Sequence, residues 1–168
     1  MKKFAILFCI SLLTYSCSKS DDGDGNTDAD FIVHRNSTLS IIENNNAANV
    51  MVENGENLVF EYRFSTEGEP QIADDEYTEI VYFELDANTE DFNLNSNDFE
   101  AANAYVGRFC FCGNTGFFPI SNGEIIGEKV GSRDWKVSLA VEAIIEAQEN
   151  SPEMSIEAEA SGIFRTRN

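Results

Sequence analysis

Histidine is nearly missing from this sequence, in which His34 is the single example. A metal centre built from several histidines is therefore excluded, and a Ser-His-Asp or Cys-His catalytic arrangement would have to use this one residue. The sequence also lacks a G-x-S-x-G nucleophile motif and a glycine-rich loop that could cradle phosphate. We therefore interpret His34 as a partly exposed polar residue near the end of a strand.

Basic residues are also scarce, because eleven Lys and Arg stand against thirty Asp and Glu, which gives a formal charge of −19. A field of this sign repels phosphate backbones and anionic lipid headgroups, and the sequence has no basic stripe that would overcome it. Nucleic acid is therefore excluded as a partner.

Long apolar runs are missing except for one near the N-terminus, from Phe4 to Leu13. This run is about half as long as the ~20 residues that a membrane-crossing helix needs. Lys2 and Lys3 precede it, and the triplet 14–16 places small residues three and one positions before Cys17. A basic start, a short apolar run and a small-x-small cleavage site are typical of a secretory signal peptide, so we expect residues 1–16 to be removed.

The sequence after the leader, Ser18-Lys19-Ser20-Asp21-Asp22 directly behind Cys17, resembles the start of Bacteroidota-type surface lipoproteins. This resemblance implies that Cys17 is lipidated and that the acidic stretch behind it displays the protein on the outer face of the outer membrane. The membrane contact would then be the acyl chains alone. The alternative is cleavage after Ser16 by an ordinary signal peptidase, which would leave a secreted protein with a free N-terminal thiol.

Residues 17–30 have almost no apolar content and alternate acids with Gly and Asn. Such a stretch cannot bury enough surface to offset its ordering entropy, so it is predicted to be a disordered acidic tether. Without the leader, nine Lys and Arg remain against thirty acids, and the formal charge becomes −21.

Residues 31–168 have ordinary globular composition and are long enough for a single domain with one core. Apolar and polar residues alternate through most of this segment, which is the pattern of half-buried strands. The longest apolar faces are Leu58, Phe60, Tyr62 and Phe64, and Trp135, Val137, Leu139, Val141 and Ala143. We predict an all-β, two-layer antiparallel β-sandwich, with an immunoglobulin-like or related Greek-key order, and a partly closed barrel as the alternative.

The turn residues refine this prediction. Residues 117–143 should form a meander of three strands, and 154–160 with 162–165 should close the sheet. Weaker strands are expected at 31–35, 39–43 and 49–52. A capping pattern at Asn97-Asp98-Phe99-Glu100 predicts a short helix, and 143–148 could add a helical turn.

Cys110-Phe111-Cys112 is the one motif of the domain whose residue types suggest a specific chemistry. In a strand the two sulfurs share one face with Arg108, so we expect the phenylalanines to point inward and the cysteines toward solvent. Outside the cytoplasm a disulfide between Cys110 and Cys112 is one interpretation, although it needs a kink such as Gly113 could give. Passive packing is equally compatible with the spacing, and a thiol-redox or soft-metal site is a third reading.

Acidic residues are too abundant for their pairs to be specific. Paired carboxylates can hydrolyse glycosides, but thirty acids make coincidental pairs almost unavoidable. A loop-bound calcium at Asp74, Asp75 and Glu76 fits oxygen-ligand chemistry better, and the same holds for the loop with Asp86, Glu90 and Asp91. Solubility remains the ordinary role of such groups, and no resident cofactor is expected.

Two phenylalanines, Phe117 and Phe118, stand beside Pro119 at the start of a strand. Both faces of such a strand start are not expected to be buried, so these residues are candidates for an exposed ligand-binding patch. Trp135 begins a regular apolar face and is predicted to be a core residue.

The sequence therefore favours a lipid-anchored, cell-surface binding or scaffold module that is not an enzyme and whose protein or glycan ligand is unknown. The first alternative is an extracytoplasmic thiol-redox or metal-binding protein that uses Cys110 and Cys112. The second is a carboxylate-dependent glycan hydrolase.

Overall fold

The computed structural model describes residues 27–44, 47–66, 76–111, 115–147 and 152–167, and within these ranges the chain forms strands and no helix. The all-β fold predicted from the alternating pattern is confirmed. No helix of the described part is long and apolar enough to cross a membrane. The strands are β1 (Thr27–Glu43), β2 (Ala48–Thr66), β3 (Tyr77–Leu85), β4 (Asp91–Asn95), β5 (Tyr105–Cys110), β6 (Gly116–Pro119), β7 (Asn122–Lys129), β8 (Asp134–Ile145) and β9 (Met154–Thr166).

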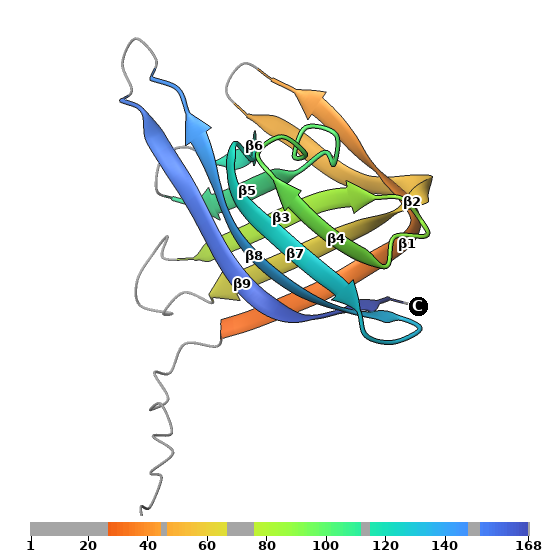
Figure 1. Cartoon of the computed structure of the whole chain (residues 1–168). Coiled ribbons are helices and arrows are strands. Elements are labelled where there is room, and N and C mark those ends of the chain that lie inside the picture. The colour runs from red at the N-terminus through yellow and green to blue at the C-terminus, as the bar shows by residue number, and fades with distance from the viewer. Residues whose placement is uncertain (1–26, 45–46, 67–75, 112–114, 148–151, 168) are drawn as a thin grey trace, which may run out of the picture.

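The described strands belong to one sheet with the order β3-β5-β6-β2-β1-β9-β8-β7-β4, and β2 also pairs with β3. All pairings are antiparallel except a short parallel contact between β1 and β9, at Ile32 and Val33. The sheet folds over at this contact, so β4, β7, β8 and β9 form one layer in front of β1, β2, β3 and β5 (Figure 1). The predicted two-layer sandwich is confirmed, but its layers are two halves of one sheet rather than the separate sheets of an immunoglobulin-like order.

The main core fills the space between the two layers with the side chains that the period-two pattern assigns to one face. Phe60 of β2 lies at its centre and is fully buried. Its ring stacks on Phe83 at 4.7 Å and meets Trp135 of the opposite layer edge-on at 5.7 Å. Trp135 is 2% exposed, so the core position predicted for it is confirmed.

A sharp bend divides the long β1–β2 hairpin near Asn36. The pairing register shifts between Arg35 and Ser37, and Asn36 adopts a positive φ of 52°. An extra residue in one strand reverses the alternation beyond it, so Leu39 faces the opposite side from Val33. Gly55 permits this close crossing, because a Cβ at that position would lie 2.6 Å from the Cβ of Thr38.

The bent end of the hairpin covers the outer face of the layer that contains β2, β3 and β5. A second, smaller core results, in which β1 and β2 side chains beyond the bend pack on that face. Its buried members are Leu39, Val50, Val59, Ile80, Tyr82 and Phe117. This layer is therefore buried on both of its faces.

The structure corrects several element boundaries. The short helix predicted at 97–100 is wrong, since residues 96–103 form successive turns, and β8 continues as a strand to Ile145 in place of a helical turn. The separate strands expected at 31–35 and 39–43 are one bent strand. β1 begins at Thr27, so the last four residues of the predicted tether already pair with β2.

Candidate functional site

The exposed aromatic patch predicted at Phe117 and Phe118 is wrong, because these residues are only 6% and 5% exposed. Phe118 packs into the main core and Phe117 into the second core, against Tyr82 and Phe109. Gly107 makes room for the Phe117 ring, since a Cβ there would lie 2.5 Å from it. Both faces of β6 are buried because the bent hairpin covers the outer one, and nothing in the local sequence of β6 signals that cover.

Cys110 and Phe111 have the opposite orientation from the one predicted for the cysteine motif. Cys110 shares the β5 face of Val106, which lies in the main core, whereas Phe109 is 37% exposed and Phe111 is 83% exposed. Cys110 is half of a disulfide. Cys112 lies outside the described residues, so the pairing of the two cysteines stays a prediction.

The other predicted site residues fall largely outside the described part of the chain. This applies to Cys17 and to Asp74 and Asp75, while Glu76 is exposed just before β3. Within the described ranges, no group of three or more His, Cys, Asp or Glu side chains is placed to hold a metal ion, so the loop from Asp86 to Asp91 forms none. A calcium site at Asp74, Asp75 and Glu76 stays a prediction.

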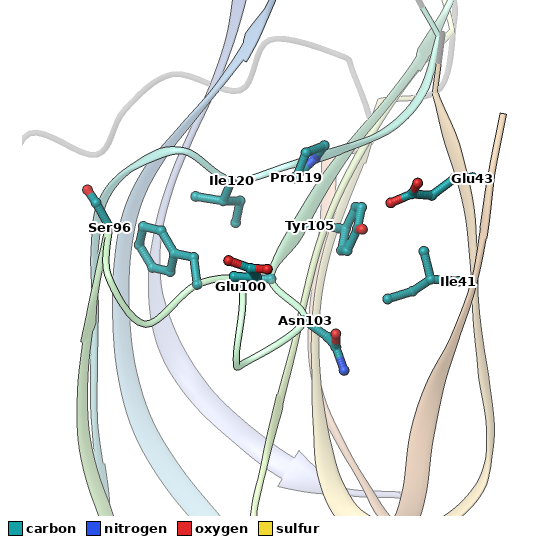
Figure 2. A pocket seen from close by; sticks show the side chains of 10 residues that line it. Ile41, Glu43, Ser96, Glu100, Asn103, Tyr105, Pro119 and Ile120 are labelled. Carbon is teal, nitrogen blue, oxygen red and sulfur yellow. The ribbon is translucent and has the colours of Figure 1, made fainter. Parts of the chain in front are cut away.

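The structure instead contains a cleft of about 560 Å³, at the end of the sandwich where the β1–β2 hairpin turns back. Figure 2 shows Tyr105 between the β1 wall, with Ile41 and Glu43, and a second wall that includes Glu100. The lining comes from β1, from the β4–β5 connection with the start of β5, and from the end of β6 with the β6–β7 connection: Ile41, Glu43, Ser96, Phe99, Glu100, Asn103, Ala104, Tyr105, Pro119 and Ile120.

The β4–β5 connection holds its shape through local hydrogen bonds and one buried anchor. Asn95 accepts the backbone N–H of Asn97 at 3.0 Å, and the Asp98 carboxylate accepts the N–H of Asn95 at 3.0 Å. Phe99 is 1% exposed and fixes the connection to the main core. Side chains of this kind favour turns over helix because they bind their own backbone, which explains why the capping pattern led to a wrong prediction.

A buried carboxylate, Glu84 of β3, fastens this wall of the cleft to the bend of the hairpin. One oxygen accepts from the Thr38 hydroxyl at 2.9 Å and the Asn57 amide at 2.6 Å. The other accepts from the Leu39 N–H at 3.0 Å and the Asn103 amide at 3.3 Å. Burial opposes ionisation of Glu84, but these four donors outweigh it and hold its pKa below the ordinary value.

Inside the cleft, the electrostatic character is negative. The pKa of Tyr105 is raised, first by burial and then by the carboxylate of Glu43. Among the described residues, neither Glu43 nor Glu100 forms an ion pair, and no Lys or Arg lines the cleft. The cleft therefore offers two carboxylates, a phenol and an amide beside the apolar side chains of Ile41 and Pro119.

Sequence reasoning missed this cleft because its lining residues are contributed by segments that are far apart along the chain. Glu43 and Glu100 looked like two of thirty interchangeable acids. The capping pattern at 97–100 was the one signal that marked the right segment, although it marked it as a helix. Only the bend at Asn36 brings the end of β1 opposite the β4–β5 connection.

His34 lies on the outer face of β1 in a polar cluster with Glu61 and Arg63. Its Nε2 is 2.7 Å from one oxygen of Glu61, and Arg63 donates from Nε to the other at 3.0 Å. Burial raises the pKa of Glu61, but the hydrogen bonds from His34 and Arg63 and their charges lower it further than burial raises it. The cluster connects β1 to β2, which suits a structural role for His34.

We expect the Glu61→Gln variant to be less stable than the parent at neutral pH, and the difference to shrink in acid. The folded-state pKa of Glu61 lies below its ordinary 4.5, so its stabilisation is complete above about pH 4.5 and is lost as the pH falls through that lowered value. Urea midpoints of both proteins between about pH 7 and pH 3 measure this. Glu157→Gln on the exposed face of β9 controls for the loss of one charge. A constant difference across the range would contradict the role of Glu61.

Comparison with known proteins gives no relative for this chain. No family model, curated protein or solved structure matches it. The function must therefore be argued from the residues and geometry described above.

Proposed function

We propose that this chain is a lipid-anchored binding module without catalytic activity, held in the outer membrane by acyl chains on Cys17 and facing the cell exterior. Its ligand binds in the cleft beside Tyr105. This ligand is part of another protein, a glycan or another small molecule. The leader, Cys17 and the acidic residues behind it support the anchor. The cleft supports the binding role, because its volume of about 560 Å³ lies within the range usual for small-ligand sites.

The placement of the cleft relative to the start of β1 is the observation that carries the proposal. β1 begins at Thr27, and two residues at its other end, Ile41 and Glu43, line the cleft. In Figure 1 the start and the end of β1 lie at opposite ends of the sandwich. A chain attached to the membrane through Cys17 would thus have its cleft at the end of the domain opposite the start of β1.

The rigidity of the cleft also supports a binding module. The Asn103 amide is tied to Glu84, and the N–H of Ile120 donates to the carbonyl of Ala104 at 3.0 Å. Walls that are fixed before the ligand arrives lose little conformational entropy on binding.

The intact mass of the mature protein from membranes of its native host tests the anchor. We expect the mass of residues 17–168 plus a diacyl- or triacylglyceryl group on Cys17, and we expect protease added to intact cells to remove the domain. An unlipidated mass would contradict the anchor, and protection from the protease would contradict the exterior location.

Thiol-redox chemistry at Cys110 and Cys112 is a second candidate function, favoured by the observation that Cys110 is disulfide-bonded. A thiol count of the folded protein before and after mild reduction distinguishes it from the first. A disulfide that resists reduction supports a structural role. A rapid, reversible change under a redox buffer would favour the second candidate.

A further inference from the structure

The two carboxylates of the cleft stand on different walls, with Glu43 at the end of β1 and Glu100 in the β4–β5 connection (Figure 2). Neither is paired with a basic group in the described part of the chain, and the lining contains none. Both side chains are exposed at the cleft surface. They are therefore accessible to a cationic ligand that enters the cleft.

Tyr105 is placed between these carboxylates, and Figure 2 shows the Glu43 side chain extending toward it. The face of an aromatic ring attracts cations, most strongly where water is partly excluded. Tyr105 is half-buried, and its phenol already lies within the field of Glu43. The ring and the carboxylate together favour positive charge at one place in the cleft.

The accessible lining of the cleft also includes apolar side chains that suit a hydrocarbon body. Ile41 is half-buried and Pro119 is exposed, whereas Phe99 and Ile120 are 1% and 5% exposed and support the lining from within the core. A strongly hydrated inorganic ion would leave this surface unused. An organic cation uses both the apolar surface and the carboxylates. Its methylene groups cover apolar surface while its charged head remains near the carboxylates.

We propose that the ligand of this cleft is a small aliphatic amine, whose ammonium groups lie against Glu43 and Glu100 and whose methylene chain packs on Ile41, Tyr105 and Pro119. This inference rests on the proposed binding function and gives its ligand a chemical class. A diamine, or the ammonium end of a longer basic molecule, satisfies the arrangement. Neutral sugars have no positive group to place between the carboxylates.

The test follows ¹H–¹⁵N NMR shifts of the mature domain during titration with 1,5-diaminopentane in about 0.15 M salt, where diffuse attraction to the acidic surface is screened. The neutral 1,5-pentanediol has the same chain and no charge, and serves as the matched ligand. We expect saturable shifts at residues 41–43 and 96–105 for the diamine alone.

Three variants locate the binding. Glu43→Gln and Glu100→Gln should each weaken the diamine about two- to fivefold, as expected for an exposed ion pair. Tyr105→Ala should weaken it by a similar factor through loss of the ring. Glu128→Gln, which removes an exposed carboxylate from β7, should leave the affinity unchanged.

The outcomes separate this inference from the proposed function. Equal binding of diol and diamine, equal effects of Glu43→Gln and Glu128→Gln, or displacement of the diamine by an equal concentration of calcium would overturn the amine assignment. If neutral oligosaccharides shift the cleft residues and the diamine does not, the amine assignment fails and the binding module stands. If neither shifts them, both proposals fail.

Discussion

Replacement of Phe60 by alanine is expected to lower the free energy of unfolding by about 3–5 kcal/mol, the range for a large aromatic side chain that is fully buried. Phe60 is fully buried and touches aromatic rings from both layers. Besides Phe83 and Trp135, its ring meets Phe92 of β4 at 5.4 Å and Phe164 of β9 at 5.7 Å. Alanine would leave a cavity that none of these rings can fill without giving up contacts of its own.

Urea unfolding at neutral pH measures this loss. Phe60→Leu keeps much of the volume and should lose less, so it provides a value if the alanine variant does not fold. Phe111→Ala is the matched control, because Phe111 is 83% exposed and its removal should change stability by less than about 0.5 kcal/mol. Equal effects at the two positions would show that the ring cluster around Phe60 is not the centre of the fold.

Glu84→Ala is expected to destabilise the protein by about 2–4 kcal/mol, although it removes one negative charge from a strongly acidic chain. The carboxylate accepts from the Leu39 N–H and from three side chains at the bend of the hairpin and the β4–β5 connection. Without it the buried N–H of Leu39 has no acceptor in place, and an unmet buried donor is costly. The same change should loosen Asn103 and with it one wall of the cleft.

Two variants make the Glu84 prediction specific. Glu84→Gln keeps one acceptor oxygen and should lose about half as much stability, whereas Glu157→Ala on the exposed face of β9 should be nearly neutral. Amide hydrogen exchange provides a local reading, since the Leu39 N–H should exchange faster in Glu84→Ala than in the parent. Unchanged protection at Leu39 would exclude Glu84 as the group that holds the bend.

The β-strand content could be predicted because alternation is a local property that each strand carries in its own residues. The face with Leu58, Phe60 and Tyr62, and the face that begins at Trp135, needed no knowledge of their partners. A residue in an extended chain has its neighbours on the other face, so period two implies a half-buried sheet. The two-layer packing follows, because each apolar face requires another to cover it.

The direction in which side chains point, toward a core or toward solvent, was harder to predict where both faces of a strand are apolar. Phe117 and Phe118 gave no indication of which side would be covered, and Cys110 with Phe111 was assigned to the wrong faces. In each case the decisive contact comes from the end of the β1–β2 hairpin or from the opposite layer, more than fifty residues away in the sequence for Phe117. No window along the chain contains that information.

Local residue patterns were enough to predict the strands and the main core face, because these depend on residues close together along the chain. The tertiary structure decided the fold-over of the sheet, the second core and the cleft. The physical reason lies in the bend at Asn36, where one extra residue reverses the alternation and turns Leu39 and Ile41 onto a distant surface. Glu43 and Glu100 acquire a common site only through that bend.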